Sequence, residues 1–422
     1  MTDPTGRALV NAQTAIESFS LSTDGRYLVY ALRRVARGTY VSHLWAVPWT
    51  GGPPRRLTDG RVRDGAPAIA PDGRQVAFTR VPAGAAGAEP QIWIMSLETA
   101  AAAPWQLTRQ QHGASSPQWS PDGKRVAFLA QAGPHRFLVG REDPKRAPIA
   151  RRITRTDFRD DEAGHLSRRT HLWVVEGRRR SRARQLTSGD FDVAHPAWAS
   201  DGKWLAYSAD VGPDANISPR SQIFRIRLDG GHTTLLASLA GDADRPAVSP
   251  DGSQLAFIGS DVDDPGDAVL SELWVVPVAG GKPRSLTASL GRSVGCEGWA
   301  DLVMADDEPG PIWLNDDTLL AMVADRARNL PYRVALDGRT SPFVEGDRVV
   351  GAGLAAAGER IAMTAGVDRR AAELYAVEEA QPDGGRLRQL TTHGSRWQSR
   401  SCALNQGPGG QARPADRHHY YR

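Results

Sequence analysis

The stretch PQWSPDGKRVAFLA, residues 117–130, decides the fold of this 422-residue chain because it recurs along the sequence. It consists of a proline, a polar turn ending in Asp-Gly, and a short strand that is almost wholly apolar. Close copies stand at 67–80, 196–209 and 246–259, and more divergent ones at 20–32, 311–323 and 353–365. Self-similarity at a regular spacing is typical of repeat architectures. The chain therefore contains about seven copies of one structural unit.

Two further phrases follow the turn phrase. The second is an apolar and aromatic strand, found at 43–48, 91–96, 171–176, 222–227, 272–277, 332–336 and 373–377. The third is a Leu-Thr pair that begins at Leu57, Leu107, Leu186, Leu286 and Leu390. Asp-Gly favours a tight hairpin in which both central residues take positive φ. Each unit is thus a small antiparallel meander, which must stack on its neighbours to bury its faces.

These units predict an all-β fold, a β-propeller of about seven blades. Dividing roughly 370 residues among seven repeats gives about 53 each, the length of a propeller blade with insertions and too long for a coil of a β-helix. Six blades would follow if the weak last copy were only a closing strand. We expect a lead-in segment at 1–20, the propeller at 21–392 and an irregular tail at 393–422.

Tryptophan holds a fixed place in the second phrase, at Trp45, Trp93, Trp173 and Trp274. Such residues could form an aromatic cage around a ligand. Their fixed position in the repeat instead favours packing between blades.

Composition fits an ordinary globular protein, with 40% hydrophobic and 24% charged residues. The sequence has no apolar run long enough for a membrane helix and no basic-then-apolar start typical of a secretory signal. Two distant cysteines, Cys296 and Cys402, predict a reducing, cytoplasmic location rather than a disulfide framework. Residues 141–184 hold 14 Lys and Arg against 7 Asp and Glu. Without a nucleic-acid recognition motif, this segment is interpreted as a solvated loop.

The sequence contains one G-x-S-x-G motif, at 291–295. In an α/β-hydrolase this motif places a serine between a buried strand and a helix. Here polar residues precede it, so Ser293 is interpreted as a loop residue. No metal-binding, Walker or dinucleotide motif is present in the sequence. We therefore expect no catalytic residue, metal or cofactor in this chain.

The longest departure from the repeat lies in the third unit, where about 40 residues separate the first two phrases, and a loop of this length in a compact repeat often serves a function. Within this stretch Arg159 precedes a cluster of three acidic residues, Asp160, Asp161 and Glu162. These four residues are the candidate substrate-binding site, since carboxylates at a propeller rim could bind the amino terminus of a peptide. The alternative is a surface cluster of salt bridges.

The repeats, together with HLWVV, QLTSGDFDV and ELWVVPVAGGKPRSLT, resemble the N-terminal propeller of the prolyl oligopeptidase (S9) family, in its acylaminoacyl-peptidase-like branch. The similarity covers roughly residues 10–395 and is most specific over 154–210. In that family the propeller caps a C-terminal α/β-hydrolase with a Ser-Asp-His triad. It admits short or unstructured peptides and often supplies residues that bind them.

The resemblance ends at Ser395, and the last residues, RWQSRSCALNQGPGGQARPADRHHYYR, show no strand pattern. We interpret them as an out-of-frame extension that replaces the hydrolase. The leading hypothesis is thus a substrate-gating propeller, inactive alone, whose partners are peptides or a separate hydrolase domain rather than nucleic acid or membrane. The alternatives are an independent binding scaffold and a TolB-like interaction module, because fold alone does not give function.

Overall fold

The computed structural model describes most of the chain. The described residues are 4–85, 87–99, 103–133, 150, 152–153, 156, 158–160, 164–166, 168–212, 215, 220–263, 269–295, 309–326, 328–344, 349–367, 370–378 and 385–395. Within these ranges a short helix, α1 (Pro4–Ala12), precedes a structure built almost entirely of strands. No helix in this part of the chain is both long and apolar enough to cross a membrane.

The strands form seven four-stranded antiparallel meanders within the described ranges, which confirms the predicted propeller fold. Single parallel bridges, Ser42–Arg63 and Asn329–Val350, join blades 1 and 2 and blades 6 and 7 into eight-stranded sheets. Blade 1 comprises β1 (Thr14–Leu21), β2 (Tyr27–Ala36), β3 (Thr39–Pro48) and β4 (Arg55–Arg56). Blade 2 comprises β5 (Val62–Ile69), β6 (Gln75–Pro82), β7 (Gln91–Ser96) and β8 (Trp105–Gln106). Blade 3 comprises β9 (Ser115–Trp119), β10 (Arg125–Ala132), β13 (Arg169–Glu176) and β14 (Arg184–Gln185). Strand β1 lies largely within residues 1–20, which were expected to form a lead-in segment before the propeller.

The remaining blades repeat this order. Blade 4 comprises β15 (Val193–Trp198), β16 (Trp204–Ala209), β17 (Gln222–Arg227) and β18 (Thr233–Ala237). Blade 5 comprises β19 (Ala243–Val248), β20 (Gln254–Gly259), β21 (Glu272–Pro277) and β22 (Arg284–Ser285), followed by a 3-10 turn, η1 (Ala288–Leu290). Blade 6 comprises β23 (Ile312–Trp313), β24 (Thr318–Ala324), β25 (Asn329–Ala335) and β26 (Thr340–Pro342). Blade 7 comprises β27 (Val349–Ala357), β28 (Arg360–Val367), β29 (Glu373–Glu378) and β30 (Arg386–Gln389).

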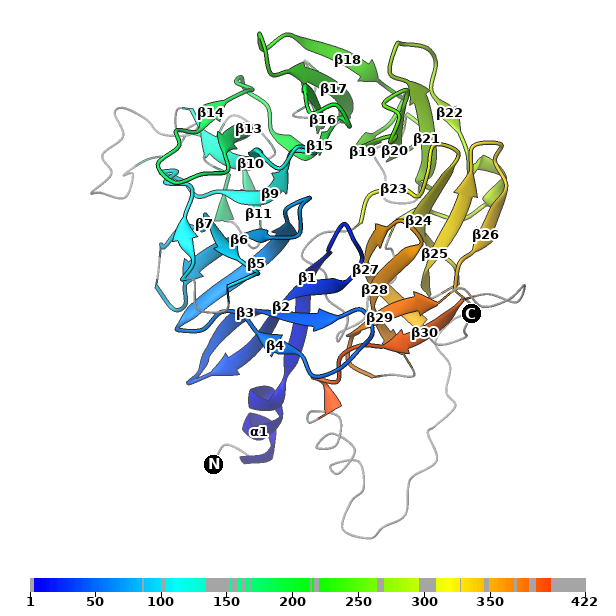
Figure 1. The fold of residues 1–422 in the computed structure, drawn as a ribbon. Helices are drawn as coiled ribbons and strands as arrows, with labels where there is room; N and C mark the ends of the chain where they lie inside the picture. The colour runs from blue at the N-terminus through cyan, green and yellow to red at the C-terminus, as the bar shows by residue number, and fades with distance from the viewer. Residues whose placement is uncertain are drawn as a thin grey trace.

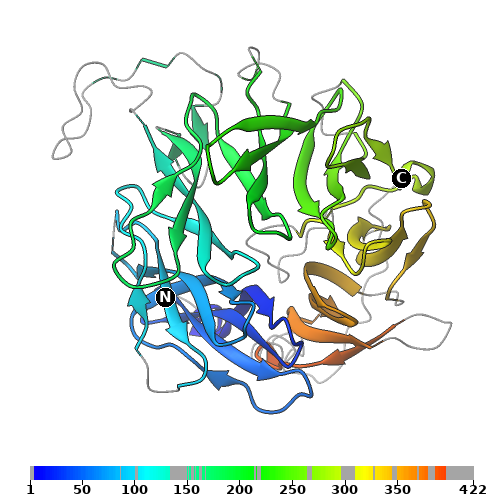
Figure 2. The ribbon, with the colours of Figure 1, turned by 45° about the horizontal axis from the view of Figure 1, so that its top comes forward.

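The blades stand in a ring, and blade 1, drawn in blue, lies beside blade 7, drawn in orange (Figures 1 and 2). Each blade is made of strands that are consecutive within that blade, so no strand is exchanged between the first and last blades. Because four antiparallel strands end on the side where they begin, the chain enters blade 1 and leaves blade 7 on the same face of the ring. We call this the terminal face.

The turn phrase forms the link between the first two strands of a blade. In blade 3 the amide of Gly123 donates to the carbonyl of Ser120 at 2.8 Å, and Gly123 has φ of 68°. Only the glycine of the Asp-Gly pair takes positive φ, so the expectation that both central residues do so is wrong. The aspartate stays at negative φ because its carboxylate is used inside the turn, where Asp122 accepts hydrogen bonds from Ser120 and the Lys124 amide.

The hydrophobic core lies between blades, as the stacking argument predicts. The second strand of each blade is largely buried, and in blades 1 to 5 its aromatic residue is among the largest fully buried side chains, as Phe78, Phe128 and Phe257 show. Each of the four second-phrase tryptophans packs in a cluster shared with the preceding blade, Trp93 with Val29 and Leu44 of blade 1 for example. Inter-blade packing of these tryptophans is therefore confirmed.

Candidate functional site

The innermost strands of blades 2 to 5 share a β-bulge just before their proline. The pairing register shifts at this point in β5, β9, β15 and β19. The bulged residues have positive φ without being glycine: Ala66 (44°), Ser116 (52°), His195 (46°) and Arg245 (51°). Such a conformation costs on the order of 1 kcal/mol per residue, and clusters at functional sites.

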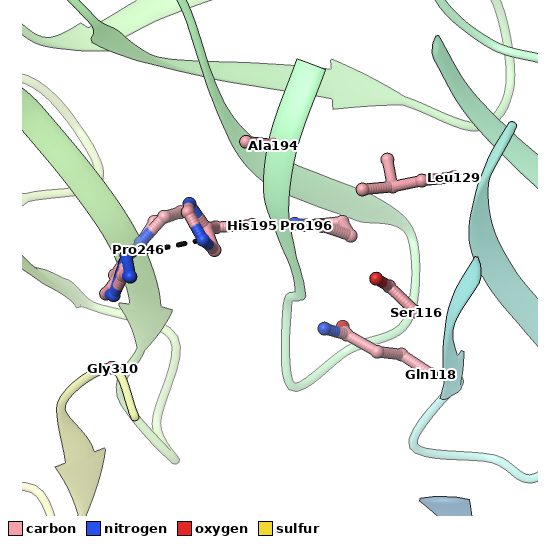
Figure 3. A pocket seen from close by; sticks show the side chains of 9 residues that line it. Ser116, Gln118, Leu129, Ala194, His195, Pro196, Pro246 and Gly310 are labelled. Atoms are coloured by element: carbon pink, nitrogen blue, oxygen red, sulfur yellow. Dashed lines mark hydrogen bonds between the residues drawn. The ribbon is translucent and has the colours of Figure 1, made fainter. Parts of the chain in front are cut away.

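Three of these bulged residues line one cavity of about 260 Å³. Its lining comes from the inner strands of blades 3 to 5, from Leu129 of β10, and from Gly310 before blade 6 (Figure 3). The full lining is Ser116, Gln118, Leu129, Ala194, His195, Pro196, Arg245, Pro246 and Gly310. The bulges that hold His195 and Arg245 lie in the middle of β15 and β19, so the cavity opens on the inner wall of the ring between these strands.

His195 and Arg245 are joined by Asp244 into one polar cluster. Nδ1 of His195 lies 2.7 Å from Oδ1 of Asp244, and the amide of Arg245 donates to the same oxygen at 2.8 Å. Nη1 of Arg245 lies 3.3 Å from Nε2 of His195 and 3.5 Å from Oδ2 of Asp244. The three side chains are only partly exposed, at 25%, 17% and 31% for His195, Arg245 and Asp244.

The hydrogen bonds set the charge of this cluster. Burial acts to raise the pKa of Asp244, but the hydrogen bond and charge of His195, with bonds from Ser208 and the Arg245 amide, lower it to about 2. Asp244 is therefore a carboxylate at neutral pH. Arginine can only donate, so Nε2 of His195 accepts from Arg245 and Nδ1 carries the proton donated to Asp244.

Two of the four residues predicted as the substrate-binding site belong to a described strand. Arg159 and Asp160 form β11 (Arg159–Asp160), which pairs with β12 (Gly164–His165) in the connection between β10 and β13. Arg159 is exposed. Asp161 and Glu162 fall outside the described residues. Arg159 is not among the described residues that line the cavity. The substrate-binding role of Arg159, Asp160, Asp161 and Glu162 stays a prediction.

Ser293 of the G-x-S-x-G motif lies in the link between blades 5 and 6. Its side chain is buried, with the residue 2% exposed, and its hydroxyl accepts a hydrogen bond from the amide of Ser271 at 3.1 Å. Its carbonyl accepts from the amide of Ala324, and the next residue, Val294, bridges to Val323. These contacts fit the interpretation of Ser293 as a structural loop residue.

Sequence reasoning missed the cluster of His195, Asp244 and Arg245. The available signal was the residue before the proline of each turn phrase, which is Ala66 in blade 2 but His195 and Arg245 in blades 4 and 5. The repeat alignment shows this variation, but it does not show that the position is a bulge facing a cavity.

The sequence was compared with those of known proteins and protein families. No family model matches the sequence. The chain is 25% identical over 397 residues to the uncharacterized peptidase YuxL of Bacillus subtilis, covering 90% of this chain and 57% of that protein. It is also 25% identical over 268 residues to dipeptidyl-peptidase 5 of Porphyromonas endodontalis, covering 59% of this chain and 37% of that protein. The chain thus spans little more than half of these curated relatives at most.

The chain resembles the N-terminal propeller of the S9 peptidases. Solved structures agree on the fold. The acylaminoacyl peptidase of Pyrococcus horikoshii matches 90% of this chain and 53% of its own, with a TM-score of 0.60 and 16% identity. The propeller domain of the trilobed protease from Pyrococcus furiosus matches 90% of this chain and 98% of its own, with a TM-score of 0.60 and 14% identity. The cavity therefore lies on the inner wall of a propeller that resembles those of the S9 peptidases.

Proposed function

We propose that this chain controls the access of peptides to the catalytic domain of an S9-type serine peptidase. The observation that carries the proposal is the match to YuxL, which extends over 90% of this chain yet only 57% of that peptidase. The similarity is thus concentrated in one part of a longer enzyme, the part that corresponds to the propeller.

The geometry supports the same function. A domain joined to either end of the propeller attaches at the terminal face, because blades 1 and 7 begin and end there. The cavity beside His195 and Arg245 lies on the inner wall of the ring. A peptide that passes through the ring toward such a domain would meet this polar cluster on its way.

In this proposal the propeller supplies no nucleophile of its own. Its support is the environment of Ser293, whose hydroxyl is buried and accepts a hydrogen bond from the Ser271 amide. A serine nucleophile needs a base within hydrogen-bond reach and space for a substrate carbonyl.

A hydrolysis assay of the purified full chain tests this inactivity. Acyl-peptide and dipeptidyl chromogenic substrates should show no turnover above buffer, with the Ser293→Ala variant indistinguishable from the parent chain. Turnover by the parent that disappears in Ser293→Ala would refute the proposal.

A mixing experiment tests the control of access. The part of YuxL outside the matched region is expressed alone and assayed with and without this chain, on a short acyl-peptide and on a folded protein. We expect the chain to bind it and to suppress cleavage of the folded protein while sparing the short peptide. Equal cleavage of both substrates in the presence of a bound chain contradicts the proposed function.

A further inference from the structure

Four arginines on the loop between β13 and β14 are exposed and have no counter-charge. The loop belongs to the basic segment 141–184, and its exposed cationic residues are Arg178, Arg179, Arg180 and Arg182. Their guanidinium groups make no ion pair or hydrogen bond with any residue of the described ranges. Arginines on nearby turns are paired, Arg125 with Glu176 at 3.1 Å and Arg227 with Asp229 at 2.5 Å. Four positive charges are therefore available to a partner at this loop.

Two contacts hold this loop against the neighbouring blades. It connects the third and fourth strands of blade 3, so it lies on the face of the ring opposite the terminal face. The guanidinium of Arg179 lies 5.1 Å from the ring centroid of Trp105 in blade 2. Arg184, at the start of β14, donates to the carbonyl of Leu228 in blade 4 at 3.0 Å. A guanidinium stacked on an aromatic ring still has N–H groups in its own plane, where they can donate to an acceptor.

The backbone of the loop shows that the fold does not require its arginines. Arg180 has φ of 63°, in the left-handed region that favours glycine. In the corresponding loops of blades 1, 4, 5 and 6 the residues with positive φ are all glycines, namely Gly51, Gly52, Gly231, Gly280, Gly281 and Gly338. Arg180 thus occupies a strained conformation that glycine adopts without cost, and strained residues of this kind cluster at functional sites. This points to a role for the arginine beyond the turn.

We propose that this loop binds a short acidic segment of a polypeptide, whose Asp and Glu side chains pair with Arg178, Arg179, Arg180 and Arg182. A planar guanidinium matches a carboxylate with two parallel hydrogen bonds, which suits arginine to such recognition. Each exposed ion pair is weak, so several neighbouring arginines are needed for measurable binding. The loop supplies four of them between positions 178 and 182. This binding is independent of the control of access proposed above.

The charges around the loop favour a short acidic segment over an extended polyanion. The corresponding loops of blades 1, 4, 5 and 6 hold at most one Lys or Arg each, at 49–54, 228–232, 278–283 and 336–339. The loops of the adjacent blades carry carboxylates, Glu98 after β7 in blade 2 and Asp229 after β17 in blade 4. A nucleic acid or an anionic membrane would extend over these carboxylates, whose repulsion opposes its binding. A segment of a few acidic residues contacts the arginine loop alone.

Fluorescence anisotropy with labelled probes tests the proposal on the full chain. The acidic probe is fluorescein-Gly-Glu-Asp-Glu-Asp-Gly amide, the neutral probe has Gln and Asn in place of the acids, and a thymidine pentanucleotide with the same label carries a matching number of phosphodiesters. The acidic peptide should bind about tenfold or more tightly than the neutral one, as expected for several exposed ion pairs together, and added salt should weaken it. Equal affinity for the two peptides overturns the proposal. Tighter binding of the pentanucleotide, or cosedimentation with phosphatidylserine vesicles that the acidic peptide does not compete away, also overturns it, because the ligand is then another polyanion.

Combined variants locate the binding on the loop. The loop variant carries Arg178→Gln, Arg179→Gln, Arg180→Gln and Arg182→Gln, and it should bind the acidic peptide about tenfold or more weakly than the parent chain. The matched control removes the same charge from exposed arginines of blades 1, 5 and 6, through Arg26→Gln, Arg55→Gln, Arg284→Gln and Arg339→Gln. This control should bind like the parent. An equal loss of affinity in both variants contradicts the proposal, because the attraction then comes from net charge alone, and so does unchanged affinity in a folded loop variant.

A single substitution separates binding from folding. Arg180→Gly supplies the residue that the turn prefers at φ of 63°, so its urea midpoint should be no lower than that of the parent. Its affinity for the acidic peptide should fall about two- to fivefold, the effect of one exposed ion pair. A variant that is less stable than the parent but binds the peptide equally well shows that Arg180 serves the turn alone, and it contradicts the proposal whatever the hydrolysis and mixing assays give.

Discussion

The side chain of Asp64 is wholly buried in blade 2, and donors surround its carboxylate. Arg80 donates to both oxygens, at 2.6 and 2.9 Å, and the hydroxyl of Thr58 donates at 2.6 Å. The Arg80 side chain is itself only 14% exposed. A buried ion pair of this kind contributes little net stability when intact, but removing one partner leaves an uncompensated charge in the interior.

We therefore expect Asp64→Asn to lower the free energy of unfolding by about 3–5 kcal/mol, because Arg80 loses its counter-charge. Urea denaturation followed by tryptophan fluorescence measures the change. Arg74→Gln serves as the control, because Arg74 pairs with Glu98 at the surface. The side chains of Arg74 and Glu98 are 67% and 62% exposed. If the urea midpoint of Asp64→Asn lies as close to that of the parent chain as the midpoint of Arg74→Gln does, this explanation is wrong.

The serine of the turn phrase holds the turn together from inside. Ser120 is fully buried, its hydroxyl donates to Asp122 at 2.6 Å, and it accepts from the amide of Arg125 at 2.9 Å. The hydrogen bond from Ser120 is also the main reason that the pKa of Asp122 is lowered. Blades 2 and 4 carry Ala70 and Ala199 at this place, so the turn forms without the hydroxyl but lacks these bonds.

Ser120→Ala should lower the free energy of unfolding by about 1–2 kcal/mol, since the Arg125 amide loses a buried acceptor. It should also raise the pKa of Asp122 toward its ordinary value. Denaturation and an NMR titration of the aspartate side chains measure the two effects. Ser188→Ala on an exposed loop is the control. A variant that shifts neither quantity relative to this control would show that the turn bonds contribute nothing.

Neighbouring inner strands are joined by a second set of tryptophans. The indole N–H of Trp119 donates to the carbonyl of Ala68 in blade 2, that of Trp198 to Gln118 in blade 3, and that of Trp313 to Ala247 in blade 5. The three distances are 3.0, 3.1 and 3.0 Å. Each bond links an inner strand to the blade before it, and the one from Trp198 ends on a residue that lines the cavity.

Replacing Trp198 with Phe keeps an aromatic ring but removes this donor. We expect a loss of about 1 kcal/mol in the free energy of unfolding, the usual contribution of a neutral hydrogen bond. Trp105→Phe is the control for the change in ring size, because the Trp105 indole donates no hydrogen bond within the described part of the chain. If the two variants unfold at the same denaturant concentration, the bond to Gln118 has no stabilising role.

The blades could be predicted from the sequence, but the cluster at the cavity could not. The blades were predictable because their signals are local: an Asp-Gly turn, an apolar strand of four or five residues, and a repeated tryptophan. The cluster at the cavity was not, since His195 and Asp244 are 49 residues apart and only the stacking of blades 4 and 5 brings them together. Residues 159–162 were predicted as a binding site from their composition alone. Composition does not indicate where a segment lies relative to a cavity.

The ring is closed by contacts between blades 7 and 1 rather than by an exchanged strand. Tyr30 and Leu32 of blade 1 pack with Leu374 and Ala376 of blade 7. Trp49, which follows β3, adds contacts with two arginines of blade 7 across this junction. Its carbonyl accepts from Arg388 at 2.8 Å, and the guanidinium groups of Arg388 and Arg360 lie 6.0 and 5.7 Å from its ring. Closure therefore depends on side chains at this one junction.

A buried histidine, His393, lies within this junction. Nε2 of His393 lies 2.8 Å from the hydroxyl of the buried Tyr30, and its ring packs edge-on against Trp45. Burial lowers the pKa of His393 from 6.5 to about 4. Burial also raises the pKa of nearby Glu373, whose carboxylate accepts from Thr391 and the Gly394 amide at 2.5 and 2.6 Å.

Protonation should weaken the ring between about pH 6.5 and pH 4. The unfolded chain binds a proton at His393 in this range while the folded chain does not, so the stability that His393 contributes above pH 6.5 is lost as the pH falls. Glu373 acts in the opposite sense, because a raised pKa favours the folded state at low pH. In His393→Gln the Glu373 contribution remains and that of His393 disappears. The parent should therefore lose on the order of 2 kcal/mol more than His393→Gln over this range.

Urea denaturation at several pH values measures this difference for the full chain. His232→Gln, a change at an exposed histidine on the β17–β18 turn, should follow the parent profile. A parent and a His393→Gln variant whose stabilities change in parallel between pH 6.5 and pH 4 would show that His393 does not sense pH at the junction. The predicted divergence would instead place the acid-sensitive step of unfolding where blade 7 meets blade 1, because Tyr30 and His393 join these two blades directly.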